Sequence, residues 1–338
     1  MTAPLVLAAA MALALVAYVL TAGADFGAGV WDLLARGPRA ERQRRAIEHA
    51  IAPIWEANHI WMILVVVLAF TGFPEAFATI GIALHIPIAI ALVGIVLRGA
   101  AFAFRHYGAT TEVARSRWGR LFAWASLATP ICLGMVVAAM CSGAIAIDEH
   151  GLVRSGFFAG WTTPFALLTG AFTLAMFALL AAVYLTLDVA DDPELQSDFR
   201  RRALACELIA GALAAAVAWR ASIDAPALFA GLAGEQWSIP VQIATMLAAC
   251  GAIAALVRRR FAVARIAVAA QIALVVLGWV LAMDGHLVLD AVPIDRAGAQ
   301  PEVIVPVLWV LALGSALLLP ALWWLLRVFK QSRPRAKG

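Results

Sequence analysis

The chain begins with the apolar run PLVLAAAMALALVAYVLTAG at residues 4–23, which contains no charged side chain. A helix needs roughly 20 apolar residues to cross a hydrocarbon core of about 30 Å, and this run is that long. Secretory signals start with a positive region and have a shorter apolar core, whereas no basic residue precedes this run. We therefore expect it to be a retained membrane-spanning helix.

Eight further apolar runs follow the first along the chain. The composition agrees with them, since 64% of the residues are hydrophobic and 14% are charged, against about 25% charged in soluble domains. The predicted spans are 4–23, 52–72, 80–104, 120–142, 161–187, 202–220, 239–257, 262–283 and 303–328. The sequence thus predicts a single all-α integral membrane domain over 1–338, with nine transmembrane helices that allow two four-helix bundles and a peripheral ninth helix.

The basic residues test this count independently of hydropathy. The odd-numbered connections with their flanks and the C-terminal tail hold 22 of the 25 Lys and Arg residues, while the even-numbered connections hold only Arg154, Arg220 and Arg296. Arg98 is counted at the flank of the third connection, and residues 200–202 in the fifth. Basic residues near span ends stay cytoplasmic. We therefore expect the N-terminus outside and the C-terminus in the cytoplasm of a bacterial inner membrane.

The same distribution excludes a nucleic-acid partner in spite of the net charge of +4. The basic residues are spread over five short segments next to spans, where topology and anionic lipid of the bilayer account for them. The thiols of Cys132, Cys141, Cys206 and Cys250 lie in apolar runs, so we expect buried cysteines without disulfides. Chemistry, if there is any, must take place in or against the bilayer.

The end of span 1 carries a carboxylate within a glycine-rich segment. Gly23 and Gly27 form a G-x-x-x-G pattern around Asp25, and small residues at this spacing let another helix approach closely. One interpretation is tight packing, with Asp25 reaching interfacial water. The other is a carboxylate at the inner mouth of a proton or ion route, because acids inside a membrane are costly and usually functional.

The start of span 2 places several polar groups on one broad helix face. Trp55, Asn58 and His59 share this face at 100° per residue, and Glu56 lies about 60° further round than His59. The four side chains are expected roughly 5–10 Å below the inner surface. They must therefore meet protein or water rather than lipid.

The histidine pattern does not predict a haem or metal site in this chain. His59 and His85 are the two histidines that lie clearly within spans, and they are expected about 10 Å apart in depth in a core of about 30 Å. The two imidazoles cannot then ligate one iron, and the chain has no C-x-x-C-H motif. His59 is expected to belong to a polar cluster with Glu56 and Asp25, or to contact a partner helix.

At these residues the chain resembles subunit II of the cytochrome bd-type quinol oxidases. The resemblance rests on Gly23-Ala-Asp25-Phe-Gly27-Ala-Gly29 and on Arg45-Ala-Ile-Glu-His-Ala-Ile-Ala-Pro53. It rests above all on Trp55-Glu56-Ala-Asn58-His59-Ile-Trp61, and it continues through Phe70-Thr-Gly-Phe-Pro-Glu-Ala-Phe77 and Arg98. Weaker echoes follow at Tyr184-Leu185, Glu194-Leu195 and Arg201-Arg202-Ala203. The first third of the chain carries the specific motifs.

The resemblance implies a terminal oxidase of several subunits that takes electrons from the quinol pool and reduces dioxygen to water. Haems and the quinol-oxidising loop would belong to subunit I, with none of the haems in this chain, and a small accessory subunit is compatible with the family. Asp25 and Glu56 would transfer protons from the cytoplasm. Trp55, Asn58, His59, Trp61 and Arg98 would form the polar cluster or contact subunit I.

The chain also departs from the family pattern. Many relatives have a second acid at the position of Ala22, and some have one in the stretch after Arg98, which here reads GAAFAF at residues 99–104. The exit of span 8, MDGH at 283–286, lacks the expected aromatic and proline-rich character. Two rival hypotheses stay open: a secondary transporter with its substrate site at the glycine-rich end of span 1, and a purely architectural oxidase subunit.

Overall fold

The computed structural model describes residues 2–51, 58–108 and 111–331 and consists almost entirely of helices. The helices are α1 (Ala3–Leu33), α2 (Ala40–Ile51), α4 (Ile60–Gly72), α5 (Pro74–Ala83), α6 (His85–Ala103), the π-helix η1 (Phe104–Gly108), α7 (Glu112–Cys141), α8 (Pro164–Asp188), α9 (Pro193–Asp224), α10 (Pro226–Gly234), α11 (Ser238–Val257), α12 (Phe261–Ala282), α13 (Ile294–Ala297) and α14 (Pro301–Gln331). Strands β1 (His286–Val288) and β2 (Val292–Pro293) form one small antiparallel hairpin. The predicted all-α membrane protein is confirmed.

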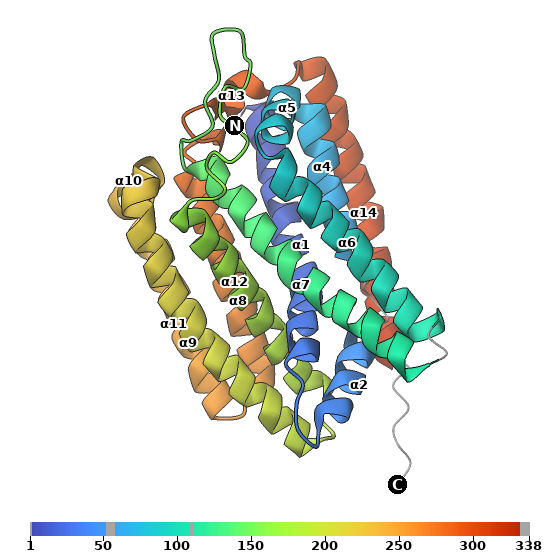
Figure 1. Cartoon of the computed structure of the whole chain (residues 1–338). Helices are drawn as coiled ribbons and strands as arrows, with labels where there is room; N and C mark the ends of the chain where they lie inside the picture. The colour runs from blue at the N-terminus through green and yellow to red at the C-terminus, as the bar shows by residue number, and fades with distance from the viewer. Residues whose placement is uncertain (1, 52–57, 109–110, 332–338) are drawn as a thin grey trace.

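The long helices run up and down through a single bundle (Figure 1). Eight of the described helices are long and apolar enough to cross a bilayer, and the bent pair of α4 and α5 brings the number to as many as nine. Figure 1 shows the N-terminal end of α1 at the top with α5 and α13 beside it, α10 at the upper left, and α2 at the bottom. The predicted nine spans agree with this range.

The predicted boundary between spans 2 and 3 needs correction. Span 3 was predicted as one helix over residues 80–104. In the structure the first part of this range belongs to α5, which ends at Ala83, and α6 begins at His85. The axes of α4 and α5 differ by 116°. Phe73 has a non-helical backbone at the break, and Pro74 follows it; proline has no N–H to continue the hydrogen-bond ladder. α5 is therefore a short segment at the upper end of the bundle.

Several arginines assigned to connections lie inside helices instead. The predicted span at 202–220 belongs to α9, which begins at Pro193, so residues 200–202 are helical. Arg98 lies in α6 and is only 1% exposed. Hydropathy placed the start of the span at 202 too far inward because arginines lower the average of their window even where they are helical.

The centre of the bundle is α8. Its residues 175–183 are all buried, although they are consecutive and therefore cover every side of the helix. A helix that is apolar all round is surrounded by other elements, and α8 contacts α1, α7, α9 and α12. The glycines predicted to allow close packing serve this contact, because a Cβ at Gly27 would overlap the Phe177 carbonyl oxygen of α8. The Trp31 indole N–H also donates to the Ala178 carbonyl oxygen at 2.9 Å.

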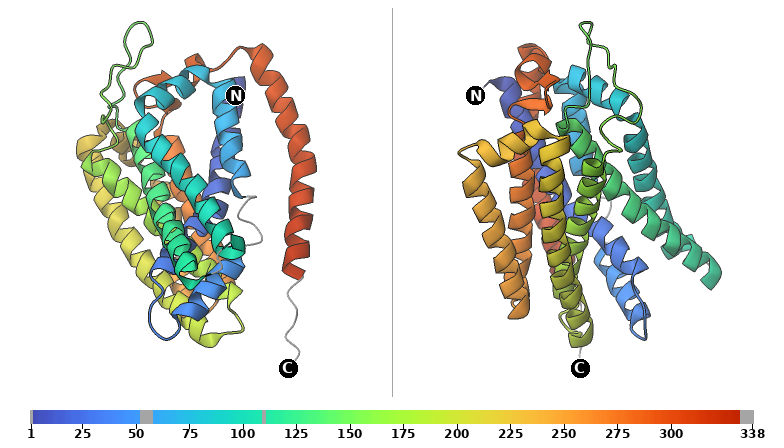
Figure 2. Two further views of the ribbon diagram at one scale, coloured as in Figure 1. Left: turned by 45° about the vertical axis from the view of Figure 1, so that its right-hand side comes forward. Right: turned by 60° about the vertical axis from the view of Figure 1, so that its left-hand side comes forward.

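The division into two four-helix bundles stays a prediction. The described helices share a large hydrophobic cluster, which joins residues of α1 and α7 to residues of α8, α9 and α12. α14 stands at the edge in Figure 2 (left). Its Trp309, Val310, Leu313 and Leu317 are each more than 60% exposed, as expected for a helix whose neighbours are lipid.

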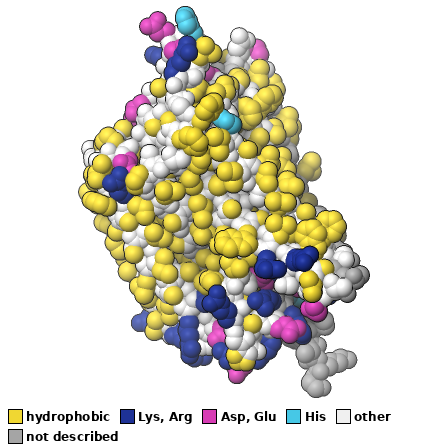
Figure 3. Space-filling view, viewed as in Figure 1, with side chains coloured by type: hydrophobic (Ala, Val, Ile, Leu, Met, Phe, Trp, Pro, Cys, Tyr) yellow, Lys and Arg dark blue, Asp and Glu magenta, His cyan; other side chains and the backbone are white. Residues whose placement is uncertain are grey.

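The surface shows an apolar belt with charged side chains towards the two ends (Figure 3). On the face shown, Lys and Arg gather at the lower end, where α2 lies, and a few acidic and histidine side chains stand at the upper end. This distribution is the three-dimensional form of the arginine pattern in the sequence. The lower end is therefore the one for which the sequence predicts a cytoplasmic position.

The contact at Gly27 gives a test of the α1–α8 packing. We expect Gly27→Leu to destabilise the chain by about 1–3 kcal/mol or more, since an added side chain would meet backbone atoms that cannot move aside. The measurement is the thermal stability of the purified protein in detergent. Gly211→Leu is the matched control, because a Cβ there has no atom within 4 Å, and a control that destabilised equally would refute the explanation.

Candidate functional site

The predicted carboxylate Asp25 is covered by protein inside the bundle. It lies in α1 with 4% of its surface exposed. Eight residues separate it from the helix end at Leu33, which corresponds to about 12 Å along the axis. Asp25 therefore does not reach interfacial water directly, contrary to the packing interpretation of the sequence.

The start of α4 supplies the partners of this carboxylate. Asn58 is 5% exposed, and its side-chain amide donates a hydrogen bond to Asp25 Oδ2. The His59 ring packs beside it, with its centroid 6.2 Å from the Tyr18 ring and 6.1 Å from the Phe26 ring. The structure thus joins Asn58 to Asp25 by a hydrogen bond and places the His59 ring against Tyr18 and Phe26 of the same helix, while the roles of these residues stay predictions.

Trp61 lies in the first turn of α4, is partly buried, and packs against the hydrophobic cluster that contains Tyr18 and Phe26. Its predicted place beside the polar cluster is therefore consistent with the packing. Trp55 and Glu56, which the sequence also assigned to the cluster, lie outside the described residues.

Arg98 completes the cluster from α6. Its guanidinium carbon lies 4.8 Å from the centre of the Phe26 ring and 5.2 Å from that of Phe122, distances at which an aromatic face attracts a cation. Its charge also interacts with the Asp25 carboxylate. Within the described part of the chain, Arg98 Nε and Nη2 and the Tyr18 hydroxyl are buried without a hydrogen-bond partner.

A second acid–base pair lies towards the lower end of the same helices. Arg105 forms two hydrogen bonds with the Asp32 carboxylate, at 3.0 and 3.2 Å. The two side chains are 13% and 6% exposed. Asp32 follows Asp25 by seven residues, and Arg105 follows Arg98 by seven, so both pairs of positions lie two helical turns apart.

Neither this second pair nor Tyr18 was predicted from the sequence. A spacing of seven residues on two helices was the signal that could have revealed Asp32 and Arg105. Tyr18 gave no such signal, because a tyrosine in an apolar run is usually a packing residue.

The lower surface is closed by ion pairs between α2 and the start of α9. Arg39 Nε lies 2.8 Å from Asp198 Oδ2, and Gln43 donates to the same carboxylate at 2.9 Å. Arg42 bridges Asp192 and Glu194, and its hydrogen bond holds the pKa of Asp192 below the usual range. These contacts hold α2 against the start of α9 at the lower end of the bundle.

The described residues contain no group of three or more His, Cys, Asp and Glu side chains that could hold a metal ion. His85 begins α6 at its upper end, 13 residues before Arg98, or about 20 Å along the axis. The four cysteines are free, and Cys132, Cys141 and Cys206 are buried as predicted. Cys250 is exposed on α11 rather than buried, because an apolar run also includes the side that faces lipid.

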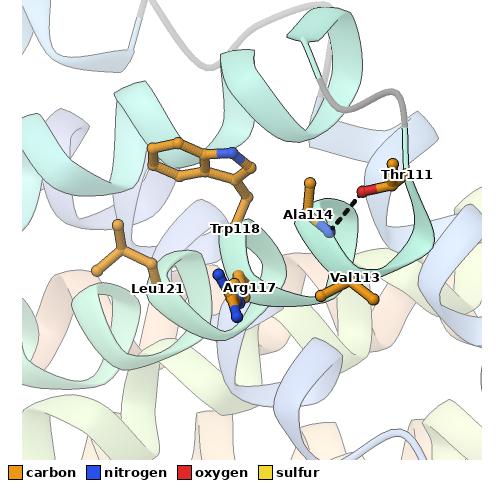
Figure 4. Close-up of a pocket in the computed structure, with 6 residues that line it drawn as sticks. All are labelled: Thr111, Val113, Ala114, Arg117, Trp118 and Leu121. Carbon is orange, nitrogen blue, oxygen red and sulfur yellow. Dashed lines mark hydrogen bonds between the residues drawn. The ribbon is translucent and has the colours of Figure 1, made fainter.

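A groove of about 400 Å³ lies at the lower end of α7 and does not coincide with the polar cluster (Figure 4). It is lined by Thr111, Val113, Ala114, Arg117, Trp118 and Leu121. Thr111 caps the helix by accepting a hydrogen bond from the Ala114 N–H at 3.2 Å. With Arg117 as its one charged lining residue, the groove does not offer an acid–base pair for catalysis.

Comparisons with known proteins agree on one family. The sequence model of "Cytochrome bd terminal oxidase subunit II" matches residues 3–329. The chain is 24% identical over 189 residues to "Cytochrome bd-I ubiquinol oxidase subunit 2" of Escherichia coli (strain K12), covering 54% of this chain and 48% of the relative. It is 29% identical over 137 residues to "Cytochrome bd ubiquinol oxidase subunit 2" of Bacillus subtilis (strain 168), covering 39% and 38%. The chain thus spans about half the length of the first relative and less of the second.

One solved structure also has the same fold over nearly the whole chain. It is "The structure of bd oxidase from Geobacillus thermodenitrificans", to which this chain is similar with a TM-score of 0.76 and 21% identity. The similarity covers 98% of this chain and 100% of the matched chain. The shared fold thus extends beyond the parts of the chain that align pairwise with the two relatives.

The buried Asp32–Arg105 pair can be tested by neutralising its partners one at a time. We expect Asp32→Asn or Arg105→Gln alone to destabilise the protein by about 3–5 kcal/mol, since either leaves a buried charge unpaired. The double variant D32N/R105Q should cost less than either single change. Thermal unfolding of all four proteins in detergent measures this, and additive losses would show that the two charges do not depend on each other.

Proposed function

The chain belongs to the cytochrome bd terminal oxidase subunit II family, and from this premise we propose that it is the second subunit of a bacterial membrane quinol oxidase. In this proposal it supports a haem-bearing subunit I and supplies protons from the cytoplasm. The activity of the complex is the transfer of electrons from the quinol pool to dioxygen, which is reduced to water. This chain lies in the inner membrane with its N-terminus outside and its C-terminus inside.

Proton supply is the part of this reaction that the chain's own residues fit. Reduction of dioxygen to water consumes one proton for each electron, so protons must enter the membrane. The observation that carries the proposal is the buried cluster in the lower half of α1, in which Asp25 accepts a hydrogen bond from Asn58 and lies within the field of Arg98. An acid buried in this way inside a membrane is costly and favours a functional role.

Each member of the cluster has a separate task in this proposal. Asp25 takes up and releases the proton. Asn58 orients the carboxylate through its hydrogen bond, and Arg98 provides a fixed positive charge that limits the cost of the ionised form. Glu56 is proposed as a second carrier and Trp55 as its neighbour, from the sequence alone. The Asp32–Arg105 pair lies between Asp25 and the lower end of α1. In this proposal it holds together the helix ends past which protons reach Asp25.

The haems are assigned to the partner subunit. In support, the His59 ring contacts the Tyr18 and Phe26 rings of α1, with centroids 6.2 and 6.1 Å away, and we assign the imidazole to this packing rather than to iron. Haem iron in proteins is held by axial His, Met, Cys or Tyr ligands in a dedicated pocket. Quinol oxidation is likewise assigned to subunit I, and a small accessory subunit is compatible with this arrangement.

The secondary-transporter hypothesis is not supported by the family match. It required a polar pair at mid-membrane and, in the second half of the chain, a helix break that corresponds to a broken, glycine-rich end of span 1. In the structure α1 is an unbroken helix to Leu33. Atoms of α7 and α8 occupy the space beside its glycines, where a substrate would have to bind. The architectural alternative for the same oxidase is distinguished from proton supply by the following experiment.

Asp25→Asn should slow oxygen consumption with quinol by roughly tenfold or more, because a positioned proton donor typically contributes 10²–10⁴-fold to the step that it serves. The haem content of the purified complex should stay normal, since Asn keeps the shape and an acceptor for Asn58. Asp25→Glu should restore part of the rate. Oxygen uptake, normalised to haem, is the measurement.

The matched control for this variant is Asp290→Asn, which makes the same chemical change at an exposed position near β1. It should leave the rate unchanged. Normal turnover in the Asp25 variant would remove Asp25 from the proton route, and a parallel loss of haem and turnover would assign it to assembly. Glu56→Gln, measured in the same way, tests the second proposed carrier.

A spectroscopic experiment tests the division of cofactors between subunits. The reduced-minus-oxidised spectrum of the complex should show haem bands, and the chain purified without its partner should show none. The His59→Leu variant should leave the bands of the complex unchanged in position. Haem bands from this chain alone, or their loss in the His59 variant, would place a haem here.

A further inference from the structure

A second buried carboxyl group lies in the other half of the bundle, apart from the Asp25 cluster. Glu207 is on α9 and is 5% exposed, and Gln271 is on α12 and is 7% exposed. The Gln271 side-chain N–H donates to Glu207 Oε1 at 2.7 Å. The predicted span placed Glu207 near a helix end, but α9 extends from Pro193 to Asp224, so Glu207 is near its middle.

The pair is surrounded by apolar side chains rather than by lipid or water. Glu207 belongs to the buried stripe of α9 that also contains Ala203, Cys206 and Ala210, while Val268 and Ile272 flank Gln271 on α12. These apolar neighbours belong to the main hydrophobic cluster of the bundle. Gln271 lies ten residues after the start of α12 and eleven before its end, so the pair is close to mid-membrane.

The hydrogen bonding of the pair is half complete in the described part of the chain. Glu207 Oε2 and Gln271 Oε1 are both buried and have no hydrogen-bond partner there. An ionised carboxylate with one neutral donor would carry a full charge in an apolar core, which costs far more than a single hydrogen bond returns. It would also leave two acceptor oxygens unsatisfied within one side-chain pair.

The charged and titratable groups nearby do not compensate such a charge. On α9, the next residue is the Cys206 thiol, and the Arg202 guanidinium stacks on Trp31 and donates to Gln43 at 2.7 Å. On α12, Arg265 lies with its guanidinium carbon 4.5 Å from the Tyr184 ring centre. Among the described residues, Glu207 forms no ion pair with any of these groups.

One proton resolves both unsatisfied atoms. We propose that Glu207 keeps its proton at neutral pH and forms a reciprocal carboxylic acid–amide pair with Gln271, which joins α9 to α12 and takes no part in proton supply. Oε2–H donates to Gln271 Oε1 while the Gln271 N–H donates to Glu207 Oε1. Each side chain then gives one hydrogen bond and receives one, and the pair carries no net charge in the apolar core.

Infrared spectroscopy of the purified oxidase complex at neutral pH tests the protonation state. The complex should show the carbonyl stretch of a protonated carboxylic acid that shifts when the protein is labelled with carbon-13 glutamate. This band should disappear in Glu207→Gln and return in the exchanged variant E207Q/Q271E, which rebuilds the acid–amide pair with its members reversed. A wild-type spectrum without a band that Glu207→Gln removes would show an ionised carboxylate and overturn the proposal.

Stability and turnover give a second, independent test. Glu207→Gln should keep the melting temperature and the oxygen-uptake rate of the wild type, because two amides can form the same two reciprocal hydrogen bonds. Gln271→Leu should lower the melting temperature, whereas Gln242→Leu at an exposed position on α11 should lower it less. Slower turnover in Glu207→Gln would make Glu207 a proton carrier and refute its exclusion from proton supply, whatever the result for Asp25.

Discussion

The Arg98 guanidinium is a permanent positive charge inside a membrane bundle, and the arrangement of four helices depends on how it is covered. α6 carries the charge, α1 supplies the Phe26 ring and the Asp25 carboxylate, and α7 supplies the Phe122 ring. Asn58, two residues before the start of α4, donates a hydrogen bond to the same carboxylate. Charges at membrane depth persist where they are paired and turned away from lipid, so these helices must stay in contact. The polar cluster is thus both a candidate functional site and a structural constraint.

That constraint is compatible with the tight packing of α1 on α8 because the two occupy different sides of α1. Gly27 and Trp31 face the backbone of α8, whereas Asp25 and Asp32 face arginines of α6 and of the adjoining η1. Small residues on one side and acids on the other explain why a single helix could be interpreted either as a packing element or as part of an ion route. The predicted close packing holds for the glycine face, and the proton route stays a proposal for the acidic one.

The sequence predicted individual helices and helix faces well, but it did not predict which faces meet. Hydropathy and arginine placement indicated the spans, and helical periodicity grouped Asn58 with His59 beside Asp25. The pairing of Asp32 with Arg105, and of Glu207 with Gln271, joins residues more than 60 positions apart, and no local pattern encodes such a contact. Arg98 was misplaced for a related reason: an arginine near a span end is usually exposed, and only the tertiary structure shows the rings that cover it.

The position of α14 has a consequence for how this chain can diverge. Many of the large apolar side chains described on α14 are exposed within the chain, so they contribute to insertion into the bilayer more than to specific packing. Exchanges among Leu, Ile, Val and Phe on that surface keep the transfer free energy and disturb no complementary neighbour within the chain. Within this subunit, α14 is therefore free to accumulate neutral substitutions faster than α1 or α8, where an added methyl group meets backbone.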